Sequence, residues 1–151
     1  MNDSMNSIQS CRNCLGTLQS LYAFIEGSPK RHAIFKNLQT NQSGTLKRVN
    51  GTRWSSRDKA VDSLINTYES VLSTLNYIKK NDKTQAGANA GPLLKAIKEF
   101  EFQFMTRVLY EIFERTGILV SSLQKADMEM DKCAKLLEIT LESFRDHSRI
   151  F

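Results

Sequence analysis

The chain has 151 residues, of which 40% are hydrophobic and 25% are charged, and its formal net charge is +5. This composition is that of an ordinary globular protein, which excludes a disordered or low-complexity chain, and the length is enough for one domain with a core. No window reaches the ~20 apolar residues of a membrane span, and the N-terminus lacks the basic-then-apolar layout of a secretion signal, so we expect an intracellular protein that is not secreted.

The first two predicted helices span about Met5 to Ile25 and about Pro29 to Leu38. Apolar residues recur every three or four positions in the first helix, at Ile8, Cys11, Leu15, Leu18, Leu21, Tyr22 and Ile25. Gly27 ends that helix, and Ser28 is placed to cap the next one. In the second helix we expect three inward residues, Ala33, Ile34 and Leu38. The polar residues 40–52 read as a loop.

Three longer elements follow, at about Ser56–Lys80, Pro92–Thr116 and Asp127–Arg149. The apolar stripe of the first consists of Val61, Leu64, Ile65, Tyr68, Val71, Leu72, Leu75 and Ile78. Residues 81–91 have no apolar stripe, so we expect the most mobile connection there. We expect Gly117 to kink or break the helix that begins at Pro92. The expected inner face of the 92–116 helix includes Leu93, Leu94, Ile97, Phe100, Phe104, Val108, Leu109, Ile112 and Phe113, broadened by Phe102 and Met105. That of the last helix includes Met130, Cys133, Ala134, Leu137, Leu141 and Phe144.

These patterns predict an all-α protein. We expect residues 1–151 to form a single bundle-like domain of about five or six helices, because every periodic segment has the spacing of a helix. The helix at 92–116 has the widest apolar face, so we expect it to be the central one. The sequence has no internal repeat at the period of a solenoid.

Few residues carry the pattern of a catalytic or metal site. Cys11 and Cys14 have the spacing of half a zinc site, but no second pair lies at a suitable distance, and Cys11 falls on an apolar stripe as a small hydrophobic residue does. His32 and His147 lack a neighbouring nucleophile, so we expect exposed polar histidines. No phosphate loop or dinucleotide fingerprint occurs. We therefore expect no enzyme activity, no cofactor, no metal and no small-molecule substrate.

The positive charge is concentrated in the first part of the chain, where residues 1–92 hold 12 Lys or Arg against 6 Asp or Glu. Four cations surround the single tryptophan there: the candidate DNA-binding residues are Lys47, Arg48, Arg53, Trp54 and Arg57. An indole ring can stack on a base while nearby cations hold phosphates. The alternative is that Trp54 packs on its own helix, as a hydrophobic staple with Arg57 or Val61.

Several stretches resemble the hAT superfamily of DNA transposases and their domesticated relatives, in particular the zinc finger MYM-type protein 1-like group. They are residues 18–31 (LQSLYAFIEGSPKR), 46–48 (LKR), 52–57 (TRWSSR), 100–102 (FEF) and 119–124 (LVSSLQ). The resemblance covers nearly the whole chain in the same order.

The resemblance implies a fragment of the all-helical insertion within a ribonuclease-H-like catalytic core. The Arg-Trp pair of the family matches Arg53 and Trp54, and in the family this tryptophan steadies a base turned out of the duplex. The three metal-binding carboxylates and the zinc fingers of the family are not matched. We therefore expect a truncated, transposon-derived nuclear protein without catalysis that binds DNA weakly.

Two further readings stay open beside DNA binding. In the first, the chain is a protein-interaction or oligomerisation module, and uncovered apolar faces on the 92–116 and 127–149 helices bind a second copy or a host protein. In the second, the chain is a relic without function.

Overall fold

A computed structural model describes residues 9–39, 44–49, 54–123 and 130–148. The described elements are all α-helices: α2 (Gln9–Glu26), α3 (Pro29–Asn37), α4 (Trp54–Asn81), α5 (Gln85–Lys98), α6 (Phe100–Leu123) and α7 (Met130–Ser148). The predicted all-α class is confirmed, and no strand occurs in the described residues. None of the described helices is long and apolar enough to span a bilayer. The chain divides into two compact units, residues 1–109 and residues 110–151, and α6 runs from the first into the second.

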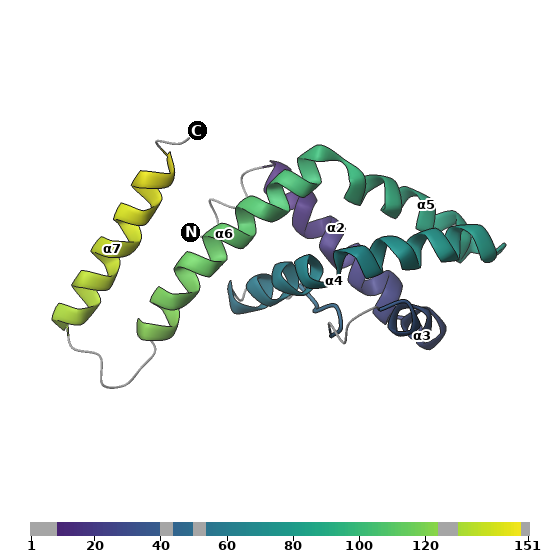
Figure 1. The fold of residues 1–151 in the computed structure, drawn as a ribbon, viewed down its shortest axis with the longest axis horizontal. Helices are drawn as coiled ribbons and strands as arrows, with labels where there is room; N and C mark the ends of the chain where they lie inside the picture. Colours follow the sequence, from purple (N-terminus) through teal and green to yellow (C-terminus); the bar gives the residue numbers. More distant parts are fainter. Residues whose placement is uncertain (1–8, 40–43, 50–53, 124–129, 149–151) are drawn as a thin grey trace. The chain divides into compact units, whose positions relative to one another are not determined.

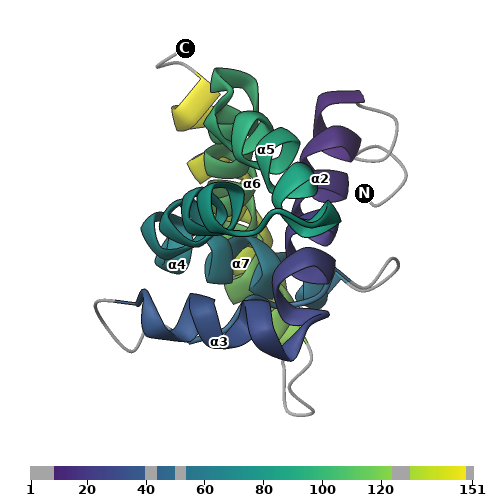
Figure 2. The same cartoon turned by 90° about the vertical axis from the view of Figure 1, so that its right-hand side faces the viewer.

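In the first unit the central helix is α4, which contacts α2, α3 and α5. Figure 1 shows α4 and α5 running side by side, and Figure 2 shows α3 across one side of α4. The predicted stripe of α4 is buried at Val61, Leu64, Val71, Leu75 and Ile78. The expectation that the 92–116 helix is central was wrong, because the sequence pattern did not reveal how many sides of α4 are covered.

Small polar residues widen the buried surface of α4. Ser63, Thr67, Ser70 and Thr74 are buried along one line of the helix. Three of these hydroxyls donate within the helix: Ser63 Oγ to the Ala60 carbonyl at 2.9 Å, Thr67 Oγ1 to the Ser63 carbonyl at 2.6 Å and Thr74 Oγ1 to the Ser70 carbonyl at 2.7 Å. A hydroxyl bonded in this way is buried without an unpaired donor, and its small volume lets a neighbouring helix approach closely.

The expected loop at residues 81–91 is wrong, because most of it is helical. Thr84 caps α5 by accepting a hydrogen bond from the Ala86 N–H at 3.3 Å, and the small residues Gly87 and Ala90 are buried. A Cβ placed on Gly87 would lie 1.8 Å from the Asp82 carbonyl oxygen, so only glycine fits at this point. Pro92, expected at a helix start, lies inside α5.

The expected helix at 92–116 is also divided, because Glu99 adopts an extended conformation (φ −64°, ψ 137°) between α5 and α6. This break changes the side of α6 that is buried: the buried residues are Phe102, Thr106, Leu109, Phe113 and Thr116. Phe100 and Phe104, predicted to be core, are 81% and 47% exposed. Gly117 does not end α6, since the roughly 1 kcal/mol cost of one helical glycine is too small to break a long helix.

Two predictions about side chains in α3 and α7 need correction. In α3 the buried residue is Phe35, whereas Ala33, which we expected to face inward, is exposed. In α7 the described part of the expected inner face is exposed, with Ala134 open to solvent and Leu137 and Leu141 at 42% and 54%. In the second unit α7 instead contacts α6 through Ser143, whose carbonyl accepts a hydrogen bond from Arg115 Nη1 at 3.1 Å.

Candidate nucleic-acid interface

The sequence-predicted DNA site begins in a short extended stretch, residues 44–49, which we call the basic segment. Lys47 and Arg48 are both exposed there, whereas Leu46 is 5% exposed and holds the segment against the first unit. The segment begins at Gly44, whose φ of 89° lies in the left-handed region that favours glycine. The structure therefore presents two adjacent cations on a stretch of backbone that is packed on one side.

Side chains from three helices hold the backbone of the basic segment. The Leu46 N–H donates to Glu26 Oε1 at 3.2 Å, the Lys47 N–H to Ser63 Oγ at 3.1 Å, and the Val49 N–H to Gln19 Oε1 at 3.1 Å. At the start of the segment the Gly44 carbonyl accepts hydrogen bonds from the side chains of Lys36 in α3 and Gln39 just after α3. These bonds anchor the backbone and leave the ends of Lys47 and Arg48 exposed.

Glu26 connects the basic segment to both neighbouring helices. One of its carboxylate oxygens accepts the Leu46 N–H, and the other lies 2.6 Å from His32 Nδ1. The His32 side chain is 35% exposed and that of Glu26 is 12% exposed. His32 was expected to be an exposed polar residue, and it instead helps to position the last turn of α2 against α3.

Trp54 is the first residue of α4, and residues 50–53, which precede it, lie outside the described residues. Its side chain, and the whole of Arg53, lie outside the described residues. The stacking role of Trp54 and its alternative as a hydrophobic staple therefore both stay predictions.

Arg57 differs from the expectation that it lies on the surface with the other cations. Its side chain is 4% exposed, and its positive charge acts on the Cys11 thiol of α2. Burial follows from the register of α4, because Arg57, Val61 and Leu64 share one face at helical spacing. The sequence contained this signal, since Arg57 lies one turn before the first residue of the apolar stripe. We therefore remove Arg57 from the set of surface phosphate contacts.

Cys11 and Cys14 are buried in α2 at 3% and 2% exposure. Burial raises the pKa of the Cys11 thiol, and the nearby Arg57 charge partly offsets that rise. Burial also raises the pKa of Cys14 to about 11, although a hydrogen bond with the Thr106 hydroxyl acts in the other direction. Both thiols stay protonated at neutral pH, as expected of small core residues. The described residues hold no group of three or more His, Cys, Asp or Glu side chains that could bind a metal.

Two exposed apolar features lie on α6 and α7, the helices on which the protein-interaction reading expects uncovered apolar faces. Phe100 and Phe104 stack on each other at the start of α6, with ring centroids 5.8 Å apart and planes at 19°. Leu137, Ile139 and Leu141 are exposed on α7. Helical spacing places Phe100 and Phe104 on the side of α6 opposite the buried Phe102, and the break at Glu99 ends the buried face of α5 before it reaches them.

No protein-family model and no solved structure matches the chain.

Proposed function

We propose that this chain is a non-catalytic, transposase-derived helical domain that binds DNA weakly in the nucleus. The observation that carries the proposal is the exposure of Lys47 and Arg48 on a backbone anchored by Glu26, Ser63 and Gln19. The family and the nuclear location rest on the resemblance of residues 18–31 and 52–57 to hAT transposases.

The anchored backbone favours phosphate binding because less conformational entropy is lost when the two cations meet a ligand. Each lysine or arginine that neutralises a phosphate releases counterions, so affinity comes mainly from charge and depends on salt. The basic segment leads to the N-terminus of α4 at Trp54, and the positive end of the helix macrodipole adds to the attraction for an anion. Arg53 and Trp54 complete the proposed contact set, with Trp54 stacking on an unpaired base.

The test of stacking is a comparison of wild type and Trp54→Ala with duplex, single-stranded and hairpin DNA. We expect the substitution to weaken binding to the single strand and the hairpin by about 1–3 kcal/mol, and to leave duplex binding nearly unchanged. Trp54→Ala removes the single tryptophan and with it the tryptophan fluorescence of the chain. Binding is therefore followed by the anisotropy of a dye on the DNA. Equal losses on all three DNAs would argue against a role in stacking.

A second candidate function is a protein-interaction or oligomerisation module. It is favoured by exposed apolar side chains in each unit: Phe100 of α6, in the first unit, is 81% exposed, and Leu137 and Leu141 of α7, in the second unit, are 42% and 54% exposed. Exposed apolar side chains that cluster on one helix commonly mark a contact with another chain.

Light scattering and DNA titration on the same sample separate the two candidates. A monomer that loses DNA affinity steeply with salt supports the first. A stable oligomer that is dispersed by Leu137→Glu with Leu141→Glu, and is indifferent to DNA, supports the second.

A further inference from the structure

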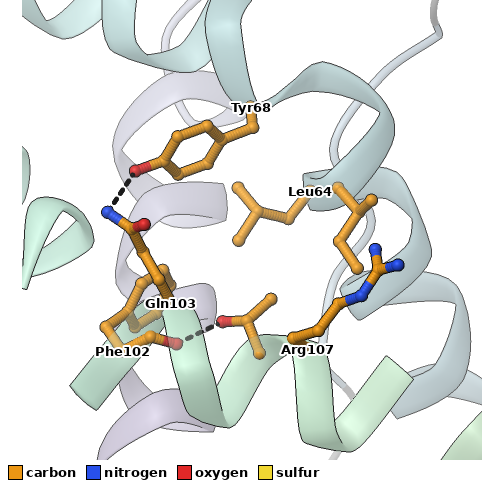
Figure 3. Close-up of a pocket in the computed structure, with 7 residues that line it drawn as sticks. Leu64, Tyr68, Phe102, Gln103 and Arg107 are labelled. Atoms are coloured by element: carbon orange, nitrogen blue, oxygen red, sulfur yellow. Dashed lines mark hydrogen bonds between the residues drawn. The ribbon is translucent and has the colours of Figure 1, made fainter. Parts of the chain in front are cut away.

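A pocket of about 230 Å³ lies between α4 and α6 in the first unit (Figure 3). Its α4 side is formed by Leu64, Ile65 and Tyr68, and its α6 side by Phe102, Gln103, Thr106 and Arg107. Leu64 and Phe102 are buried, at 0% and 7% exposure, and form an apolar base. No local sequence pattern indicates this site, because its two sides are about 40 residues apart along the chain.

The size of the pocket suits one side chain. Pockets for drug-sized molecules occupy roughly 300–1,000 Å³, whereas a cavity of about 150 Å³ holds a benzene ring. The volume of about 230 Å³ lies between these values, which fits a bicyclic aromatic group better than a single ring. Pockets of this kind receive the aromatic anchor residues that dominate many protein interfaces.

The polar groups at the pocket are held in fixed positions. The Tyr68 hydroxyl donates to the Ile97 carbonyl at 2.8 Å and accepts a hydrogen bond from Gln103 Nε2 at 3.2 Å. Gln103 Nε2 also donates to the Lys98 carbonyl at 3.2 Å, so both amide hydrogens have acceptors. Burial raises the pKa of Tyr68, which keeps its phenol a donor at neutral pH. The Thr106 hydroxyl is likewise engaged, because it donates to the Phe102 carbonyl at 2.8 Å.

The carbonyl oxygen of the Gln103 side chain is the acceptor that this network leaves open. Within the part of the chain that the structure describes, Gln103 Oε1 receives no hydrogen bond. A ligand matched to this pocket is therefore flat and apolar and carries a single N–H donor at its edge. The polar edges of a purine would remain unpaired against Leu64 and Phe102, and phenylalanine has no donor for Oε1.

We propose that this pocket binds the indole ring of a tryptophan in a partner protein, with the indole N–H donating to Gln103 Oε1. The Tyr68 ring forms one wall of the site and Leu64 and Phe102 its base. This inference rests on the second candidate function, an interaction module, and requires no contact with DNA.

The experiment titrates the ¹⁵N-labelled chain with N-acetyl-tryptophanamide and follows the backbone amide signals by NMR. Parallel titrations use the 1-methylindole analogue, which lacks the N–H, N-acetyl-phenylalaninamide and adenosine. Because one side chain supplies only a few kcal/mol, we expect a Kd on the order of 1 mM. The signals of Ile65, Tyr68, Gln103 and Thr106 should shift. The loss of one hydrogen bond should weaken binding of the 1-methyl analogue by about three- to tenfold.

Gln103→Leu tests the hydrogen bond itself, because it removes the acceptor at an exposed position and leaves an apolar side chain that is one bond shorter. In this variant the two indole compounds should bind equally. Gln85→Leu is the matched control, since Gln85 is an exposed glutamine on α5 outside the pocket lining, and it should keep the wild-type preference. Circular dichroism verifies that each variant is folded.

Three results would overturn the proposal: no shift at these residues up to 10-fold the expected Kd (about 10 mM), equal shifts with phenylalaninamide or adenosine, or a preference for the N–H compound that survives Gln103→Leu. None of these results bears on the α7 surface, whose test is Leu137→Glu with Leu141→Glu. Failure at the pocket is therefore distinguishable from failure of the interaction module as a whole. A titration with a tryptophan-containing peptide distinguishes a protein partner from a free small molecule as the natural ligand. If the ligand is a protein, the peptide should bind at least as tightly as N-acetyl-tryptophanamide.

Discussion

Helices α4 and α7 show opposite departures from a simple apolar pattern. In α4 the polar residues Ser63, Thr67 and Thr74 are buried together with the apolar stripe. In α7 the residues at apolar positions, Leu137 and Leu141, are exposed. The periodic pattern identifies a helix and one face of it, but the number of neighbouring helices decides how much of each face is covered.

The physical difference between the helices lies in what each can pack against. The hydroxyls of α4 are small and bonded to its own backbone, so α4 can approach the glycine and alanine residues of α5. Among the described contacts between α7 and α6, Arg115 Nη1 donates to both the carbonyl and the hydroxyl of Ser143, which are polar groups. We therefore expect α4 to contribute to the stability of the fold and α7 to be available for binding another molecule.

The largest expected effect comes from truncating a leucine in each helix. Leu75 is 0% exposed, so Leu75→Ala should lower the free energy of unfolding by about 2–5 kcal/mol through lost burial and the cavity left behind. Leu141 is 54% exposed, and Leu141→Ala should change it by less than about 0.5 kcal/mol. Urea denaturation measures both. Similar costs for the two variants would mean that α7 is covered in solution.

A glycine pair tests the close approach at the turn between α4 and α5. Gly87→Ala should cost about 2–3 kcal/mol, because the added Cβ would meet the backbone of Asp82 at 1.8 Å. Gly91→Ala is the matched control, because the nearest contact of its Cβ is the flexible end of Lys79 at 3.9 Å. The control should be neutral or stabilise by up to about 1 kcal/mol. The account of this turn fails if both substitutions have the same effect on urea midpoints.

Removing the carboxylate of Glu26 should release the basic segment. Glu26→Ala removes the acceptor of the Leu46 N–H and the partner of His32, and we expect a loss of about 1–2 kcal/mol. Hydrogen exchange at Leu46 and Lys47 should accelerate by more than exchange in the α4 core. Glu69→Ala, at an exposed glutamate of α4, should leave both quantities unchanged. Unaltered exchange at Leu46 in the Glu26 variant would contradict the anchoring role.

The smallest expected effect is a pH dependence at Asp82. Hydrogen bonds from the Thr84 hydroxyl and N–H, together with the Lys30 charge, lower the pKa of Asp82. A lowered folded-state pKa means that the stabilisation is present at neutral pH and is lost as the pH falls through the folded-state pKa. Asp82→Asn should therefore be slightly less stable than wild type at pH 7, and the difference should shrink in acid. Melting temperatures from pH 7 down to pH 2 measure it, and a constant difference would reject the pKa shift.

The sequence predicted α2 and α4 from their unbroken apolar stripes, and α3 from the helix-start signal at Ser28. It missed the first half of α5 because that half packs through glycine and alanine, which the hydrophobic pattern does not register. Pro92 was read as a helix start, yet it is tolerated inside α5, where it and Ala88, whose carbonyl it leaves unpaired, are both exposed.

The candidate site was only partly predictable from the sequence. The exposure of Lys47 and Arg48 follows from a polar loop, but the anchors Gln19, Glu26 and Ser63 lie on two other elements, and no local pattern indicates them. The burial of Arg57 could have been found by extending the stripe of α4 one turn backward. The α4/α6 pocket could not, because it depends on where the break at Glu99 places α6.

The most direct test of the DNA-binding proposal compares two pairs of exposed cations. Lys47 and Arg48 lie in the basic segment, whereas Lys79 and Lys80 are equally exposed in the last turn of α4. We expect Lys47→Ala with Arg48→Ala to weaken duplex binding and to reduce the slope of log K against log salt by about 1.8, since each phosphate contact contributes about 0.9. Lys79→Ala with Lys80→Ala should leave the slope unchanged. Equal reductions in both double variants, or no binding by wild type at low salt, would contradict the account.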